Sequence, residues 1–266
     1  MLGVFDSGLG GLSVVRRLKE RLPHHALLFF ADQAHVPYGD RKPHDLASLL
    51  ASNVGFLNEA GVSIIVMGCN TSCAIAQQFG WPQSHAPILD LIESAALVVQ
   101  RDGLKNVGVV ATTATVAAQA YSRAIVARVP SARVFEVAAP ALVPLVEAGK
   151  AGTEEAHEAV AAVCKRLPRD LDAVILACTH YPILDLHFAD ALSEGVVLID
   201  PAVEQAGRAA QLAVANGIAR GIAPTTYVTS GDVERFRTAV RMITGEFDPN
   251  VRSMSANLTA SPRGTA

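Results

Sequence analysis

The chain has 266 residues, half of them hydrophobic and 18% charged, so it has ample apolar material for one large or two small domains. Its net charge of −3 argues against a broad nucleic-acid interface, which needs a basic face. No apolar run reaches the roughly 18 residues of a membrane span. The first residues carry an acid, Asp6, and no basic residue, unlike a secretory signal. Four cysteines are too few for a disulfide scaffold, so we expect a cytoplasmic protein.

Short apolar runs recur along the chain, and helical patterns lie between them. The runs are continuous rather than alternating, which is typical of strands buried on both faces of a parallel sheet. They predict strands at residues 2–5, 27–31, 63–67, 107–111, 134–137, 173–177 and 196–199. Two apolar stripes predict helices, one through Leu46, Leu49, Leu50, Val54 and Leu57 and one through Ala156, Val160, Val163 and Leu167. Alternating strands and helices indicate a doubly wound α/β fold.

The strand–helix pattern restarts near Val107, after a predicted helix over residues 91–101. This restart predicts two α/β domains. The first comprises residues 1–94 together with 203–266, and the second comprises residues 95–202. The segment at 227–229 and the apolar stripe after it, Val233, Phe236, Val240 and Ile243, are expected to return to the first domain. The tail from Asn250 is rich in Ser, Arg and Thr and is expected to fray.

Cysteines follow two of the predicted strands. Cys69 comes after the run at 64–67 and Cys178 after the run at 173–177, and short polar residues follow each thiol. Reactive groups belong where the strands of an open α/β sheet end. Two thiols from two such strands suggest a site with one thiol on each side of a substrate. That geometry removes a proton from one face of a carbon and returns one to the other.

A lone cysteine is more often only a small buried hydrophobic residue. Helices that start at Thr71 and Tyr181 would favour the thiolates of the two strand-end cysteines, because backbone N–H groups would point toward each sulfur. Cys73 and Cys164 fall within predicted helices, and we interpret both as structural.

Acidic residues follow the first two strands. Asp6 and Ser7 end the first, where Asp6 could cap a helix that begins near Leu9, handle a proton or anchor an ammonium group. The glycines that follow resemble a nucleotide loop, but the dinucleotide fingerprint needs glycine where Ser13 stands. A carboxylate cradle would use the same backbone donors with fewer glycines. Asp32 ends the second strand.

Three further side chains are candidates. Tyr38 lies in a Pro-Tyr-Gly turn that makes a phenol available. His180 is a plausible acid–base partner beside Cys178, although a single histidine is often structural. Glu147 ends an apolar stretch and could be a solvated helix end.

No lysine stands in a strand-end motif that could anchor pyridoxal phosphate. Four side chains could bind zinc by type, but no second Cys-x-x-Cys pair supports them, namely Cys69, Cys73, Cys178 and His180. We therefore expect no metal and no cofactor.

Four motifs together resemble the glutamate racemase family in order and spacing: residues 3–11, 36–39, 69–71 and 178–182. Residues 107–116 and 142–147 also look like family segments, so the resemblance covers about 2–236. It implies two pseudo-symmetric domains with the active site in the cleft between them. It also implies cofactor-independent interconversion of L- and D-glutamate, with D-glutamate entering peptidoglycan. Family members are often dimers, so a homodimer is expected.

The resemblance assigns roles to residues of this chain. Cys69 and Cys178 would be the two proton donors and acceptors. Four residues would assist proton handling: Asp6, Asp32, Glu147 and His180. The amino acid would be held by Asp6 and His180 together with Ser7, Tyr38, Gly39, Asn70, Thr71, Thr112, Thr115 and Thr179.

This chain departs from the family at several positions. Gln33 stands where the family usually has Thr, His35 where Arg is common, and Cys73 where Ser is usual. Ala31 and Ala111 stand where Gly is common. None of these removes a catalytic residue, but they bear on substrate preference and oligomer contacts. The alternatives are an aspartate racemase of the same superfamily, a non-catalytic binding protein for an acidic metabolite, and a redox or zinc protein.

Overall fold

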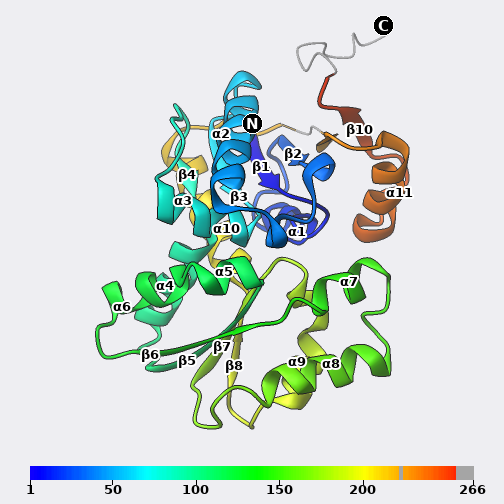
Figure 1. Ribbon diagram of the computed structural model, residues 1–266. Helices are drawn as coiled ribbons and strands as arrows, with labels where there is room; N and C mark the ends of the chain where they lie inside the picture. The colour runs from blue at the N-terminus through cyan, green and yellow to red at the C-terminus, as the bar shows by residue number, and fades with distance from the viewer. Residues whose placement is uncertain (222–223, 256–266) are drawn as a thin grey trace, which may run out of the picture.

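The computed structural model describes residues 1–221 and 224–255, and it contains two parallel β-sheets with helices packed around them (Figure 1). The first sheet has the order β10-β9-β2-β1-β3-β4 and the second the order β6-β5-β7-β8, and every strand pair is parallel. The predicted doubly wound α/β fold is confirmed.

The strands of the first sheet are β1 (Leu2–Asp6), β2 (Leu27–Ala31), β3 (Ile64–Met67), β4 (Ile88–Leu89), β9 (Thr226–Thr229) and β10 (Asn250–Ser253). Those of the second are β5 (Asn106–Ala111), β6 (Arg133–Ala138), β7 (Ala173–Ala177) and β8 (Val197–Ile199). Every residue of β1, β2, β3 and β7 is buried. This explains the unbroken apolar runs, because helices cover both faces of these strands.

Helices of two groups surround the sheets. Around the first lie α1 (Leu12–Arg21), α2 (Pro43–Glu59), α3 (Asn70–Phe79), α10 (Pro201–Ala215) and α11 (Val233–Thr244), with the short 3-10 helices η1 (Gln33–His35) and η2 (Tyr38–Asp40). Around the second lie α5 (Thr113–Ala117), α6 (Ala120–Arg128), α7 (Leu142–Glu147), α8 (Glu154–Cys164) and α9 (Asp185–Ala191), with the 3-10 helix η3 (Tyr181–Leu184). The helix α4 (Leu91–Arg101) packs against both α10 and α6 and so joins the two groups. No helix in these described ranges is long and apolar enough to cross a membrane.

The two sheets repeat one strand order. β2-β1-β3-β4 in the first corresponds to β6-β5-β7-β8 in the second, as the predicted pseudo-symmetry requires. Equivalent glycines lie at the same register, since Gly3 faces Ile65 and Gly108 faces Val174. A Cβ added at either glycine would lie 2.9 Å from a side-chain carbon of a neighbouring residue. The two halves therefore share a packing requirement as well as a topology.

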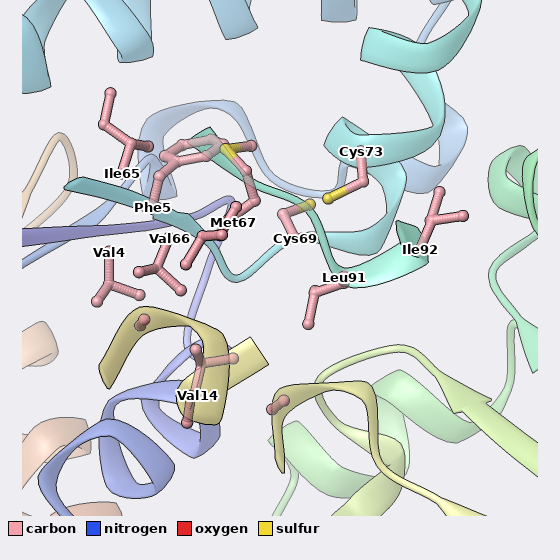
Figure 2. Packing of buried hydrophobic residues seen from close by; sticks show 14 of the residues in the cluster. Val4, Phe5, Val14, Ile65, Val66, Met67, Cys69, Cys73, Leu91 and Ile92 are labelled. Carbon is pink, nitrogen blue, oxygen red and sulfur yellow. The ribbon is translucent and has the colours of Figure 1, made fainter. Parts of the chain in front are cut away.

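The core of the first half extends to the turn that carries the first thiol. Figure 2 shows Val4, Phe5 and Met67 in this cluster together with Cys69 and Cys73. Cys73 is completely buried within α3, and Cys164 is buried at the end of α8. Both lie in helices, as the sequence predicted.

The end of the chain differs from expectation. Residues 250–253 were expected to fray, but they form β10, which pairs with β9 at the edge of the first sheet. Val251 is buried there, and the polar residues beside it are tolerated because an edge strand is only partly covered. The rest of the expected fraying tail, from residue 256, lies outside the described residues. The domain boundaries near 95 and 203 stay a prediction.

Candidate active site

A cavity of about 370 Å³ lies where the carboxyl ends of strands from both sheets meet. The residues that line it end or follow β1, β2 and β3 in the first sheet and β5, β6 and β7 in the second. All of the predicted site residues except Asp32 and Thr115 line it, namely Asp6, Ser7, Tyr38, Gly39, Cys69, Asn70, Thr71, Thr112, Glu147, Cys178, Thr179 and His180. This volume lies in the range of small-molecule sites, roughly 300–1,000 Å³.

Cys69 stands between β3 and α3. It is the N-cap residue of α3 in extended conformation, and its thiol donates to Ser7 Oγ at 3.5 Å. Burial and the negative charge of Asp6 raise the pKa of the Cys69 thiol to about 11, although contacts with Ser7 and Ser72 act in the opposite direction. The thiol form is therefore favoured at neutral pH, in contrast to the expectation that the start of α3 would favour the thiolate.

Asp6 both supports a turn and faces the cavity. Its Oδ2 accepts a hydrogen bond from the Gly11 N–H at 2.6 Å, at the N-cap of α1. Burial raises the pKa of this carboxyl, while the charge of His180 and the nearby N–H groups oppose the rise. Gly10 lets this turn approach the other half, because a Cβ there would lie 2.3 Å from Thr179 Oγ1. Close packing between the two halves thus explains why glycine stands here, and a phosphate-binding loop is not needed to explain it.

Cys178 stands at the equivalent place after β7, beside an ion pair. Its Sγ lies 3.7 Å from His180 Nδ1, and His180 Nε2 lies 3.4 Å from Glu147 Oε1. Burial alone would lower the pKa of His180, but the contacts with Cys178, Glu147 and Asp6 outweigh it and raise the pKa to about 10. The contact with His180 lowers the pKa of Glu147. The imidazole is therefore charged at neutral pH. The helix expected at Tyr181 is the four-residue 3-10 helix η3.

Hydroxyl groups connect the two halves along the cavity wall. Thr71 Oγ1 of α3 lies 3.1 Å from Thr112 Oγ1, which follows β5. Thr115 lies 3.0 Å behind Thr112 and is fully buried, so it supports the wall without lining it. Ser13 Oγ donates to the Thr179 carbonyl at 3.2 Å. The threonine contacts fix the hydroxyl groups of Thr71 and Thr112, and the Ser13 bond holds the backbone at Thr179.

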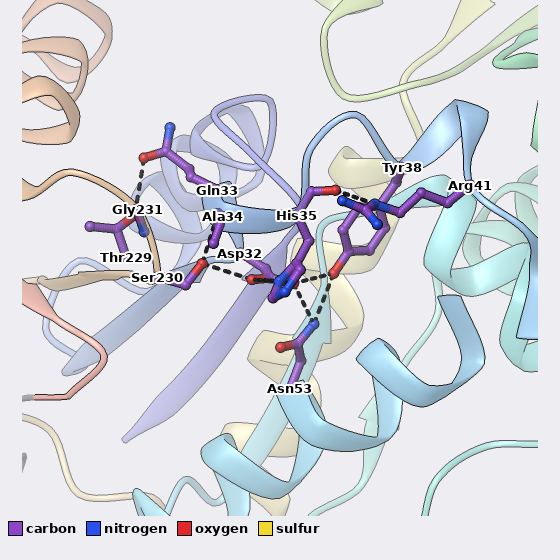
Figure 3. A network of polar contacts seen from close by, with 10 residues as sticks. All are labelled: Asp32, Gln33, Ala34, His35, Tyr38, Arg41, Asn53, Thr229, Ser230 and Gly231. Carbon is purple, nitrogen blue, oxygen red and sulfur yellow. Dashed lines mark hydrogen bonds and ion pairs between the residues drawn. The ribbon is translucent and has the colours of Figure 1, made fainter. Parts of the chain in front are cut away.

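Asp32 does not line the cavity and instead holds a residue that does (Figure 3). Its carboxylate accepts hydrogen bonds from Tyr38 OH at 2.6 Å and from Ser230 Oγ at 2.7 Å, and His35 Nδ1 lies 2.8 Å away. Asn53 Nδ2 donates to the same phenol at 3.0 Å. Burial would raise the pKa of Asp32, but these hydrogen bonds lower it. An ionised Asp32 thus fixes the Tyr38 ring.

The cavity contains more acidic than basic groups. Its lining includes two carboxyls and one imidazole but, among the described residues, no Lys or Arg. An anion bound here would rely on hydroxyls, amides and backbone N–H groups, including those at the start of α3. No cluster of three or more His, Cys, Asp or Glu side chains suited to a metal occurs in residues 1–221 or 224–255.

Some wall residues were not predicted as site residues. Most of them are apolar, and they comprise Gly8, Val36, Pro37, Thr113, Pro140, Val143 and Pro144. Pro140 follows β6, so the rule that sites form at the carboxyl edge of a sheet could have identified it. Of the Asp32 partners, Asn53 carried no such signal because it lies inside α2, whereas Ser230 follows β9 and the same rule could have identified it.

A repeated α/β unit that presents one thiol from each half to a shared cavity defines a class of enzyme, the amino-acid racemases. More narrowly, the chain belongs to the Asp/Glu/Hydantoin racemase family, whose sequence pattern matches residues 10–209. A glutamate racemase from Synechococcus sp. (strain CC9605) is 42% identical over 204 residues, which cover 76% of each chain.

Two solved structures share the whole architecture. Glutamate racemase from Thermus thermophilus in complex with beta-chloro-D-alanine has a TM-score of 0.84 at 33% identity and covers 97% of both chains. Glutamate racemase from Francisella tularensis subsp. tularensis SCHU S4 in complex with D-glutamate has a TM-score of 0.84 at 27% identity. That match covers 96% of this chain and 97% of the other.

Proposed function

We propose that this racemase interconverts L- and D-glutamate without a cofactor, using Cys69 and Cys178 as its two acid–base groups. The observation that carries the proposal is that the two thiols follow equivalent strands, β3 and β7, and line one cavity. A planar carbanion bound between them would expose one face to each sulfur.

The chemistry needs one thiolate and one thiol in each turnover. The thiolate takes the proton from Cα, and the electron pair left on carbon delocalises into the α-carboxylate. The opposite thiol then donates its proton to the other face and becomes the thiolate. By the family pattern, Cys69 would act on the D-enantiomer and Cys178 on the L-enantiomer.

Neutral donors would stabilise the charge that develops on the carboxylate. The hydroxyls of Ser7, Thr71 and Thr179 and the amide of Asn70 line the cavity, and fixed donors of this kind are effective where water is excluded. Thr112, the Gly39 backbone and Tyr38 would complete the binding site, with Thr115 behind Thr112. Neutral donors would hold the carboxylate less tightly than charged side chains, so the product could leave the site.

Different charged groups lie beside the two thiols. The His180 imidazole lies beside Cys178 and would assist proton handling there, with Glu147 holding the ring. Asp6 lies near Cys69, where it would favour the thiol and could bind the substrate ammonium group. Asp32 would assist indirectly through Tyr38.

The substrate assignment rests on the relatives, since those described above are named glutamate racemases and one was solved with D-glutamate. D-Glutamate made by this chain would supply peptidoglycan synthesis. Two reactive thiols need a reducing compartment, which favours the cytoplasm. We retain a homodimer as the expected assembly.

The test is proton NMR of L-glutamate with purified, reduced protein in D₂O without added cofactor, alongside L-aspartate. Loss of the glutamate α-proton signal together with formation of D-glutamate, faster than for aspartate, is the expected result. Faster exchange of aspartate would reassign the substrate. No exchange with either acid on folded protein would contradict the proposal and favour a binding protein.

A further inference from the structure

Tyr121 connects the second half of the molecule to the residue that follows Cys69. It lies on α6, is completely buried and does not line the cavity. Its hydroxyl donates to Asn70 Oδ1 at 2.5 Å. Asn70 begins α3 and lines the cavity. The bond therefore runs from a helix of one half to the start of a helix of the other.

This contact determines which way the Asn70 amide faces. The Tyr121 hydroxyl donates to the amide oxygen, so the amide nitrogen lies on the other side of the group. With the amide reversed, the phenol proton would lose the acceptor that Asn70 Oδ1 provides, and a buried donor without an acceptor is costly. The oxygen of the amide thus faces Tyr121.

The nitrogen of the same amide is left for another partner. Within residues 1–221 and 224–255, Asn70 Nδ2 donates to no protein group, although the residue is buried and lines the cavity. The cavity holds no Lys or Arg among its described lining residues, so an amide N–H fixed in direction is a valuable donor to a bound carboxylate.

We propose that Tyr121 is a positioning residue for substrate binding: its hydroxyl holds the Asn70 amide so that Nδ2 donates to a substrate carboxylate. This inference rests on the proposed function, because the ligand is the amino-acid substrate. Burial raises the pKa of Tyr121 well above its usual value, so the phenol remains a donor throughout the working pH range.

The test is Tyr121→Phe, which removes one oxygen and leaves the buried ring. We expect KM for glutamate to rise about tenfold in both directions, as the loss of one oriented hydrogen bond implies, while kcat changes much less. Tyr227→Phe is the matched control. Tyr227 is also fully buried, but it lies on β9 and its hydroxyl donates to Glu246 after α11 at 2.6 Å, so KM should not change.

Two further variants separate positioning from general support. In an Asn70→Ala background, Tyr121→Phe should have no additional effect on KM, since the two residues act through one bond. Asn70→Asp keeps the acceptor for Tyr121 and removes the donor, so KM should rise at least as much as in Tyr121→Phe. Additive effects, an unchanged KM in Tyr121→Phe or an unchanged KM in Asn70→Asp would overturn the assignment. A wild-type protein that exchanges no α-proton would overturn the proposed function and this inference with it.

Discussion

The two thiols stand at equivalent places in a repeated strand order, yet their surroundings carry opposite charge. Cys69 has the Asp6 carboxyl nearby, and burial with that charge raises its pKa to about 11. Cys178 has the His180 cation 3.7 Å away. The repeated backbone therefore sets where the sulfurs lie, and a few non-equivalent side chains place a different charged group beside each.

The largest test of this comparison removes each thiol in turn. Cys69→Ser and Cys178→Ser should each lower the racemisation rate by about 10³-fold or more, because under the proposed mechanism every turnover uses both groups and a hydroxyl is a far weaker acid than a thiol. D-Glutamate formation is followed by circular dichroism. Cys164→Ser, in α8 away from the cavity, is the control and should keep the rate. A near-normal rate in either Cys69→Ser or Cys178→Ser would contradict the proposal that both thiols act in the reaction.

A moderate effect is expected on the reactivity of the first thiol. In Asp6→Asn the negative charge is gone, so the pKa of Cys69 should fall from about 11 toward the value that burial alone sets. More thiolate is then present at pH 8, and iodoacetamide should modify Cys69 several-fold faster.

Peptide mass spectrometry gives the rate at each cysteine. Cys164 is an internal reference, because burial alone raises its pKa to about 11 and Asp6 is not among the causes. In the wild type, modification of Cys69 should rise about tenfold per pH unit up to about pH 11, as thiolate forms. If Cys69 reacts at the same rate in the wild type and in Asp6→Asn, the inferred effect of the Asp6 charge on this thiol is wrong.

The smallest effect concerns stability. Gly3→Ala and Gly108→Ala should each lower the free energy of unfolding by about 1–3 kcal/mol, since the added Cβ meets a side-chain carbon at 2.9 Å in both cases. Gly55→Ala in α2 is the control. Nothing lies within 4 Å of its added Cβ, and alanine favours a helix over glycine by roughly 0.5–1 kcal/mol. Urea unfolding measures all three, and strongly unequal costs at the two strand glycines would show that the halves pack differently.

The sequence predicted those features that depend on local pattern. Buried strands carry continuous apolar runs, so their positions followed within about one residue, as at Leu27–Ala31 and Ala173–Ala177. The cysteines were found because the carboxyl ends of strands are marked by the runs themselves. His180 lies beside Cys178 in the chain as well as in space.

Features that depend on distant partners were not predictable. Asp32 was expected in the site, but its neighbours Asn53 and Ser230 come from 21 and 198 residues away and turn it toward Tyr38 instead of the cavity. Strand β10 has one buried residue and no apolar run, so nothing in the sequence pattern indicated it. The strand forms by pairing with the edge of β9. The raised pKa of His180 also depends on Glu147, which lies at the end of α7 and far from His180 in the chain.

Between turnovers the enzyme has to be reset. Under the two-thiol reaction, conversion of D- to L-glutamate leaves Cys69 protonated and Cys178 as thiolate, which is the form that accepts the L-enantiomer. The sulfurs belong to residues only 5% and 6% exposed, so protons must pass through the cavity mouth before another D-enantiomer can react. After each turnover the free protein would therefore stay briefly in the protonation state that the released product left. At high substrate concentration this return step, rather than the bond-breaking step, would limit the net flux.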